Sequence, residues 1–128
     1  DVICVPCGTG ATLAGLLDAC PVGVEVLGFS ALKNADFLEQ AIRDQSQTAP
    51  TNWRVIRDYH FGGFAKITPE LVDFMQTFEK KSATPLEPVY TGKMFFGLYD
   101  LIRRGYFNKG CRIVVVHTGG LQGNRGFD

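Results

Sequence analysis

A glycine-rich turn near the start of the chain is the feature whose residue types and spacing point most directly to chemistry. Residues 2–5 form a short apolar run typical of a buried strand, and Cys-Gly-Thr-Gly-Ala-Thr at 7–12 leads from it into small, apolar residues that predict a helix. Glycine lets the backbone turn its amides inward. Free amides at a helix start, with the helix dipole, favour an anion. The turn therefore predicts a phosphate site; the alternative is a tight connection whose glycines serve packing alone.

The residues around this turn narrow the kind of phosphate. A nucleoside-triphosphate loop needs lysine directly after its last glycine, and Leu16 stands there after Gly15. The dinucleotide fingerprint needs a third glycine where this chain has Leu13, and Ser30 rather than an acidic residue ends the next apolar run. A small monophosphate ligand fits the turn better than a nucleoside triphosphate or a nicotinamide dinucleotide.

The cysteines and one histidine offer a second set of reactive groups. Cys4 and Cys7 form a CxxC pair, which indicates a redox pair or half of a zinc site, but Cys20 and Cys111 stand alone and complete no zinc site. We interpret the pair as one buried strand cysteine and one loop cysteine, with all four thiols reduced, and expect no metal site. His117 follows the last apolar run, at the sheet edge where α/β proteins place ligands.

Alternating strand-like and helix-like segments must position these groups. The predicted strands are 2–5, 24–29, 54–56 and 113–116, and the predicted helices are 11–17, 35–42, 69–81 and 93–104. Thr68 and Pro69 are typical of a helix start, and Gly105 of a helix end. This alternation predicts an α/β fold with a mainly parallel sheet flanked by helices.

Two of these segments carry further expectations about burial. The run 113–116 is Ile-Val-Val-Val, four consecutive β-branched residues, which is typical of a strand buried on both faces. The segment 93–104 is apolar nearly all round, so we expect this helix to be buried on more than one side.

Composition limits the classes of protein to which the chain can belong. Its 128 residues are 45% apolar and 20% charged, which suits one folded domain with a core. Thirteen basic residues balance 13 acidic ones, and this zero net charge argues against nucleic-acid or membrane partners. No apolar run approaches the ~20 residues that span a bilayer, and we expect no signal peptide, because no charged-then-apolar segment opens the sequence. We expect a cytoplasmic location.

Three motifs together resemble one family of enzymes. Residues 5–15 (VPCGTGATLAG) resemble the phosphate cradle of fold-type II pyridoxal-phosphate enzymes. Residues 88–93 (PVYTGK) and 117–120 (HTGG) resemble segments of the aminocyclopropane-carboxylate deaminase and D-cysteine desulfhydrase family, in matching order and spacing. The resemblance covers essentially the whole chain. It implies a domain like the larger, cofactor-binding domain of tryptophan-synthase-β-like enzymes, with pyridoxal 5'-phosphate as cofactor and a small amino acid as substrate.

The resemblance also assigns roles to individual residues. Those assigned to cofactor binding are Gly8, Thr9, Gly10, Ala11, Thr12, Thr91, Gly119 and Gly120. The first five would hold the phosphate, Thr91 would face the pyridine nitrogen, and the last two would lie close to the cofactor, where bulk is excluded. Tyr90 matches an active-site tyrosine and is the residue that we expect to be catalytic; the alternative is a core tyrosine.

Two departures from the family pattern bear on the reaction. Deaminases of this family have glutamate where this chain has Thr91; a carboxylate keeps the pyridine nitrogen protonated and the ring a strong electron sink, whereas a neutral hydroxyl does not. Phe64 stands near the place of a second active-site tyrosine. Both departures favour α,β-elimination of a D-cysteine-like substrate, to pyruvate, ammonia and a thiol or sulfide, over aminocyclopropane-carboxylate deamination.

The family's Schiff-base lysine lies before the glycine turn, and no lysine of this chain matches it. The lysines in question are Lys33, Lys66, Lys80, Lys81, Lys93 and Lys109. We interpret Lys93, which opens a helix, as structural or as a rim charge. We expect residues 1–128 to be the C-terminal part of the cofactor-binding domain, without the lysine-bearing N-terminal region and therefore inactive in isolation. The full enzyme is expected to be a homodimer.

Two alternatives stay open at this point. One is a non-catalytic α/β module that binds another anion, or none, at the glycine turn. The other is a nicotinamide-binding domain.

Overall fold

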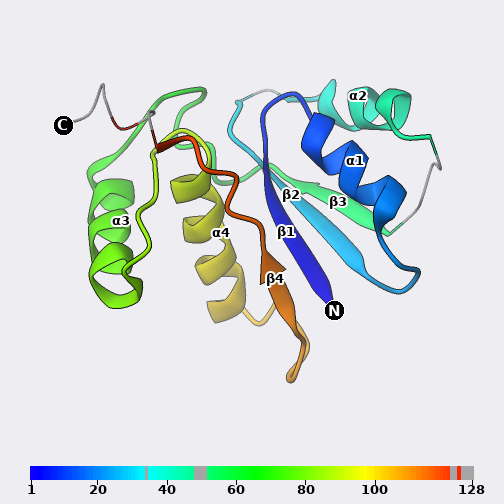
Figure 1. The fold of residues 1–128 in the computed structure, drawn as a ribbon. Helices are drawn as coiled ribbons and strands as arrows, with labels where there is room; N and C mark the ends of the chain where they lie inside the picture. The colour runs from blue at the N-terminus through cyan, green and yellow to red at the C-terminus, as the bar shows by residue number, and fades with distance from the viewer. Residues whose placement is uncertain (34, 48–51, 122–123, 125–128) are drawn as a thin grey trace.

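Strands and helices alternate in the computed structural model, except that the last two helices follow each other; the structure describes residues 1–33, 35–47, 52–121 and 124 (Figure 1). The strands of this described part are β1 (Val2–Cys7), β2 (Glu25–Ser30), β3 (Trp53–Ile56) and β4 (Ile113–Val115). Its helices are α1 (Ala11–Ala19), α2 (Leu38–Gln45), α3 (Pro69–Ser82) and α4 (Thr91–Arg103). Each predicted strand and helix is confirmed, with ends that differ by at most three residues.

The four strands form one parallel sheet in the order β3-β2-β1-β4. In its register, Val2 of β1 lies opposite Glu25 of β2 on one side and Ile113 of β4 on the other. The predicted α/β fold with a mainly parallel sheet is therefore confirmed. Because all strands run the same way, their carboxyl ends share one edge of the sheet, which is uppermost in Figure 1.

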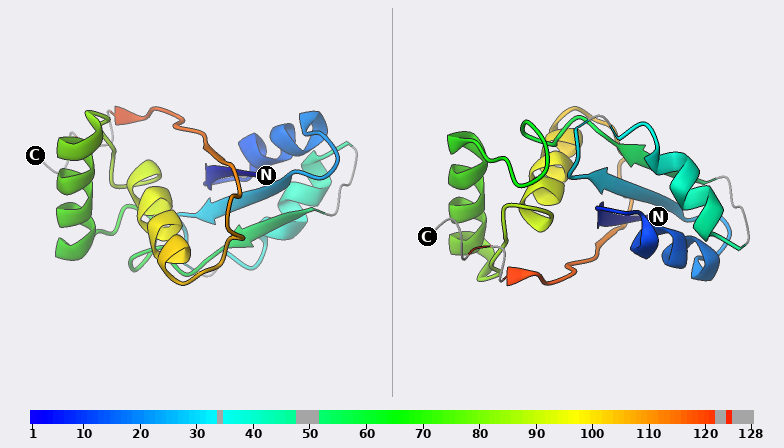
Figure 2. Two further views of the ribbon diagram at one scale, coloured as in Figure 1. Left: turned by 90° about the horizontal axis from the view of Figure 1, so that it is seen from below. Right: turned by 90° about the horizontal axis from the view of Figure 1, so that it is seen from above.

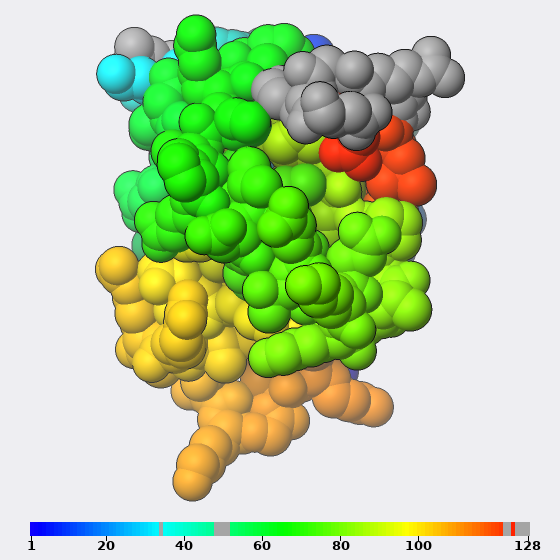
Figure 3. Space-filling model, turned by 90° about the vertical axis from the view of Figure 1, so that its left-hand side faces the viewer, coloured from blue at the N-terminus to red at the C-terminus, as the bar shows by residue number. Residues whose placement is uncertain are grey.

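Helices cover both faces of the sheet. One face packs against α1 and α2, and the other packs against α4, with α3 outside it (Figures 1 and 2). Alternation along β1 matches this arrangement, because Val5 and Cys7 join the core cluster of α1 and α2, whereas Val2 and Cys4 join that of α4. Figure 3 shows α3, in green, forming the outer surface on its side of the molecule.

The ends of α3 and α4 follow the predicted capping residues. The Thr68 hydroxyl accepts a hydrogen bond from the Leu71 amide at 3.2 Å, and Pro69 is the first residue of α3. Beyond α4, Gly105 adopts a positive φ of 76°, and its amide donates to the Ile102 carbonyl. As predicted, α4 is covered on two sides, by the sheet and by α3, although Tyr99 and Ile102 stay exposed.

The predicted burial of the last strand is wrong. Among the residues that the structure describes, β4 lies at the edge of the sheet, where Val114 is 59% exposed and Ile113 and Val115 are half-buried. β-Branched residues favour any extended segment because their stiff side chains suit a pleated surface. Four consecutive β-branched residues therefore indicate a strand, but they do not indicate whether it has neighbouring strands on both sides.

The prediction of a loop position for Cys7 is also wrong, because Cys4 and Cys7 both lie buried in β1. Burial raises the pKa of each thiol to about 12, so both stay protonated near neutral pH and are poor nucleophiles. All four cysteines are free thiols. In the described ranges, no three His, Cys, Asp or Glu residues gather as a metal would require. Nor does any helix there have the length and apolar character to cross a membrane.

Candidate functional site

The three sequence motifs meet at the carboxyl edge of the sheet. The glycine turn follows β1, residues 117–120 follow the neighbouring β4, and Tyr90 directly precedes α4 (Figure 1). A Cβ atom added to Gly8 would lie 3.1 Å from Cε1 and 3.2 Å from the hydroxyl of Tyr90, so the tyrosine ring lies against the turn. A Cβ atom on Gly120 would lie 3.9 Å from Cγ of Glu87, the residue that directly precedes the second motif, so the third motif lies beside the second.

The glycine turn ends at Gly10, the N-cap of α1. Gly10 has a φ of 86°, and a Cβ atom there would lie only 2.6 Å from Cγ1 of Ile42 in α2. Gln45 of α2 donates from Nε2 to the Thr9 carbonyl at 3.3 Å. Because the C=O and N–H of a trans peptide point in opposite directions, the Gly10 amide faces away from α2. The turn therefore needs glycine at position 10 for both its backbone angle and its contact with α2.

The start of α1 is open to an anion. Within the described part of the chain, no side chain caps this helix, and its first turn holds no acidic residue. Ala11 and Thr12, the first two helical residues, are exposed. Each other helix has an acidic group at its start: Glu39 in α2, Glu70 in α3 and Glu87 just before α4. The dipole and the amides of α1 can therefore take a phosphate that the other helix starts would repel.

The start of α4 is occupied by Glu87, which the sequence analysis missed. Its Oε1 accepts the amides of Tyr90 at 2.8 Å and Thr91 at 2.6 Å, and its Oε2 accepts the amide of Val89 at 2.7 Å. Its backbone carbonyl accepts the Gly92 amide at 2.8 Å, and its own amide donates to Oγ1 of Thr91 at 3.0 Å. One residue thus bonds four successive amides, and the Glu-Pro-Val-Tyr-Thr spacing is the signal that could have revealed it.

Tyr90 and Thr91 differ in their access to the space above the sheet. Tyr90 is half-buried between Gly8 and Phe64, whose ring centroid lies 6.2 Å from that of Tyr90. Thr91 is fully buried. Because its hydroxyl oxygen accepts the Glu87 amide, the hydroxyl proton is left for donation to another group. The tyrosine predicted to be catalytic thus lies at the glycine turn, whereas the threonine predicted to bind the cofactor is buried in the protein interior.

Lys93 is buried, at 1% exposed, so the interpretation as a rim charge is wrong and the structural one holds. Its Nζ donates to the Gly63 carbonyl at 2.8 Å, which ties α4 to the loop that carries Phe64. Burial lowers the pKa of Lys93 to about 8, although the nearby Glu87 carboxylate acts in the opposite direction.

This pKa predicts how Lys93 affects stability as the pH changes. Between the folded value of about 8 and the unfolded value of 10.5, the unfolded chain binds more protons at this amine, so its contribution to stability rises with pH. We expect the stability of the wild type relative to Lys93→Met to rise by about 2–3 kcal/mol across this window and to stay level below pH 8. Urea titrations of both proteins measure it. The difference between the two free energies of unfolding cancels the titration of groups that both proteins share, such as Cys4 and Cys7. If the free energies of unfolding of the two proteins change with pH in parallel, the prediction is contradicted.

The motif after β4 is held by its own histidine. The His117 ring accepts the Gly119 amide at Nδ1, at 3.0 Å, so Nε2 carries the proton and donates to the Pro85 carbonyl at 2.9 Å. Gly119 and Gly120 have φ values of 82° and 76°. Such angles favour glycine, so the turn needs these residues for its shape, independently of any ligand.

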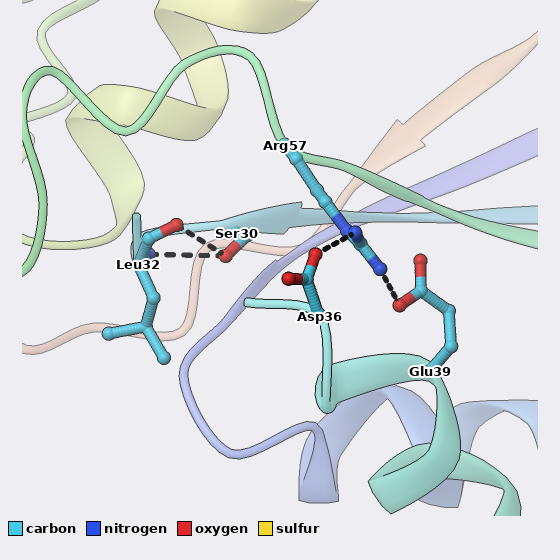
Figure 4. A network of polar contacts seen from close by, with 5 residues as sticks. All are labelled: Ser30, Leu32, Asp36, Glu39 and Arg57. Carbon is cyan, nitrogen blue, oxygen red and sulfur yellow. Dashed lines mark hydrogen bonds and ion pairs between the residues drawn. The ribbon is translucent and has the colours of Figure 1, made fainter. Parts of the chain in front are cut away.

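A second polar network, also missed from the sequence, supports α2. Arg57, just after β3, bonds Asp36 through Nη1 at 3.1 Å and Glu39 through Nη2 (Figure 4). Nearby, the Ser30 hydroxyl bonds both polar groups of the Leu32 backbone. Glu39 and Arg57 also line a cavity of about 660 Å³ along β3, which includes no residue of the predicted site. The network holds the segment before α2, the helix that packs on Gly10.

Comparisons with known proteins agree with this arrangement. No family model matches the chain. Over 96% of its length it is 36% identical to a Pyrococcus horikoshii protein that bears the name of a 1-aminocyclopropane-1-carboxylate deaminase. Over the same share it is 31% identical to the bifunctional D-cysteine desulfhydrase/1-aminocyclopropane-1-carboxylate deaminase, mitochondrial, of Arabidopsis thaliana. These matches span 40% and 33% of the two relatives.

A solved structure supports the same likeness. The crystal structure of a homologue of 1-aminocyclopropane-1-carboxylate (ACC) deaminase superposes on this chain with a TM-score of 0.82 and 31% identity. The superposition covers 97% of this chain and 41% of the homologue. The resemblance predicted from the three motifs is therefore confirmed, as is the fold. The chain spans about two fifths of the length of the P. horikoshii relative, at 40%.

Proposed function

Because the chain is similar over nearly its whole length to aminocyclopropane-carboxylate deaminases and a D-cysteine desulfhydrase, we propose that it is part of a pyridoxal-phosphate-dependent enzyme acting on a small amino acid. Residues 1–128 would be the C-terminal part of the cofactor-binding domain, and the Schiff-base lysine would come from the N-terminal region. The relatives are more than twice as long as the match, which is consistent with this division.

The observation that carries the proposal is the contact between Tyr90 and the glycine turn. The ring of Tyr90 lies against Gly8, next to the start of α1, which is free of side-chain caps in the described chain. A phosphate held at that helix start would therefore have a phenol hydroxyl close by. This pairs an anion site with a proton-carrying side chain, as a cofactor enzyme needs and a purely structural turn does not.

The residues present fit pyridoxal 5'-phosphate. The backbone amides of residues 8–12 would hold its phosphate, with the Thr9 and Thr12 hydroxyls as further donors. The free proton of Thr91 would be donated to the ring nitrogen, and Gly119 and Gly120 would keep bulk away from the cofactor. Since Thr91 is fully buried, this contact requires the neighbouring chain to move when the cofactor binds. When bound, the cofactor supplies an electron sink for bonds broken at the substrate α-carbon.

We favour elimination from a D-cysteine-like substrate. Overall, D-cysteine and one water give pyruvate, ammonia and hydrogen sulfide. A neutral hydroxyl at position 91 holds no fixed negative charge against the ring nitrogen, so it suits a substrate with a good leaving group. Phe64, packed edge-on against Tyr90, provides no second hydroxyl. Tyr90 would hold or deliver a proton at the substrate from its place beside Gly8.

The experiment is to express the full reading frame that encodes this chain and record its visible spectrum with pyridoxal phosphate. D-Cysteine, L-cysteine and 1-aminocyclopropane-1-carboxylate are then supplied in turn, and pyruvate and sulfide are measured. We expect sulfide release with D-cysteine, and a loss of about 100-fold in kcat for Tyr90→Phe. An activity that depends on NAD would favour the nicotinamide-binding alternative. The absence of any cofactor absorbance would favour the non-catalytic anion-binding alternative.

The remaining proposals concern assembly and location. We propose a homodimer for the full enzyme, by the resemblance to its family, which sedimentation of the full-length protein tests. We propose a cytoplasmic location, which the four free cysteines support. The Arabidopsis relative is named as mitochondrial, so fractionation of the source cells is the direct measurement.

A further inference from the structure

Glu87 concentrates an unusual number of hydrogen bonds at the start of α4. It is 1% exposed, and its two carboxyl oxygens accept the amides of Val89, Tyr90 and Thr91. Residue 88 is a proline, which has no amide to satisfy. The residues from 88 to 92 thus include no free amide, since the Gly92 amide bonds the Glu87 carbonyl.

These bonds fix the backbone on both sides of the Tyr90 side chain. The Tyr90 amide and the next amide, that of Thr91, share one oxygen, Oε1, so the two peptide planes that flank the Tyr90 Cα are both held. Tyr90 has φ −122° and ψ −66°, outside the regular helical and extended regions. The hydrogen bonds that Glu87 accepts from the amides of residues 90 and 91 fix this conformation on both sides of the Tyr90 Cα.

The direction of the Tyr90 ring follows from this backbone. The ring lies against Gly8 on one side and meets Phe64 at an interplanar angle of 63°. If the peptides around residue 90 relaxed toward a helical geometry, the Cα–Cβ bond would turn and the ring would leave the glycine turn. We propose that Glu87 is a positioning residue, which holds the hydroxyl of Tyr90 over the phosphate-binding turn. This inference rests on the proposed function, because it assigns to Glu87 a role in the same site.

The experiment combines Glu87→Gln with Tyr90→Phe in the full-length protein. Glutamine has nearly the shape of glutamate but replaces one acceptor oxygen by an NH₂ donor, so it cannot accept all three amides. We expect Glu87→Gln to lower kcat by about tenfold or more, with KM changed less than about threefold. In the Tyr90→Phe background the same change should lower kcat by less than about twofold, because a residue that acts through Tyr90 has no effect once its hydroxyl is gone.

A second readout needs neither cofactor nor turnover. Hydrogen exchange of the cofactor-free protein should speed up about tenfold or more in the peptide that contains residues 89–92, since loss of a hydrogen bond to a charged group lowers local protection. Glu79→Gln is the matched control, because Glu79 is an exposed glutamate of α3. It should change neither kcat nor exchange. If Glu87→Gln does not fold, Glu87→Asp, which keeps the charge but withdraws both oxygens by one methylene, replaces it.

The outcomes separate the two proposals. If the wild type binds pyridoxal phosphate and is active, but Glu87→Gln matches Glu79→Gln in kcat and exchange, the role of Glu87 is rejected and the function stands. If the losses in kcat from Glu87→Gln and Tyr90→Phe simply multiply, Glu87 does not act through Tyr90 and the inference is also rejected. If the wild type binds no cofactor, the proposed function falls and takes the inference with it.

Discussion

Replacing Gly10 by alanine is expected to destabilise the protein by about 2–4 kcal/mol and to weaken phosphate binding at the turn. Gly10 has a φ of 86°, which an alanine adopts only with strain. The new methyl group would also lie 2.6 Å from Cγ1 of Ile42, a methylene carbon next to the branched Cβ of a fully buried residue. Because the core around α2 is closely packed, the turn rather than the helix must move.

Gly15 provides the matched control for this substitution. It lies in α1, the helix that Gly10 caps, and is exposed. Apart from its chain neighbours and the backbone of its own helix, no atom of the described residues lies within 4 Å of a Cβ atom placed there. Gly15→Ala should therefore raise stability by about 0.5–1 kcal/mol, because alanine favours the helix. Urea unfolding of the two full-length variants, with a titration of pyridoxal phosphate for each, measures both effects. Equal stability of the two variants would show that the turn at Gly10 is not constrained as the structure indicates.

The elements of the fold could be predicted because their signals are local. Residues 2–5 and 24–29 form apolar runs, and Thr68, Pro69 and Gly105 mark helix ends by properties of their own side chains or backbone. The position of β4 at the edge could not be predicted in this way. Edge or centre depends on which strands pair, and this information lies in contacts between residues more than 100 positions apart, such as Val2 with Ile113.

The sequence motifs indicated the residues that the proposed site would turn toward a ligand, but not the residues that support them. The glycine turn and Tyr90 carry recognisable motifs, whereas Glu87 and Arg57 act through backbone amides or through carboxylates 18 and 21 residues away. The burial of Lys93 could not be predicted from the sequence either, because it depends on how α4 packs against the loop at Gly63. A sequence pattern indicates which chemical group a residue carries. Tertiary packing decides whether that group faces a ligand or another part of the protein.

The two helix starts at the site illustrate this division. The start of α1 lacks an internal anion in the described chain, while the start of α4 already holds the Glu87 carboxylate. An external phosphate at α4 would meet this negative charge, so a phosphate would be favoured at the start of α1 instead. In the proposed enzyme, Glu87 would have two roles: it would exclude an anion from the start of α4, and it would hold Tyr90 beside the start of α1.

Thr91→Glu is expected to shift the proposed substrate preference of the full-length protein away from D-cysteine and toward 1-aminocyclopropane-1-carboxylate by about tenfold or more, equivalent to about 1.4 kcal/mol. A carboxylate at position 91 would hold a proton on the ring nitrogen of bound pyridoxal phosphate, where the neutral hydroxyl of threonine holds none firmly. The measurement is the visible spectrum of the bound cofactor together with kcat/KM for both substrates.

This substitution is also expected to lower the stability of the protein, and a control variant must separate that effect from the change in substrate preference. Thr91 is fully buried, and Oγ1 accepts the Glu87 amide, so glutamate would leave that amide without its partner and bring a second carboxyl group toward Glu87. We expect a loss of about 1–3 kcal/mol in stability from the amide alone. Thr91→Val removes the same acceptor without adding charge, so it should share the loss in stability but not the change in preference. If Thr91→Glu leaves the spectrum of the bound cofactor unchanged, position 91 does not face the ring nitrogen, and its hydroxyl serves only the turn that Glu87 closes.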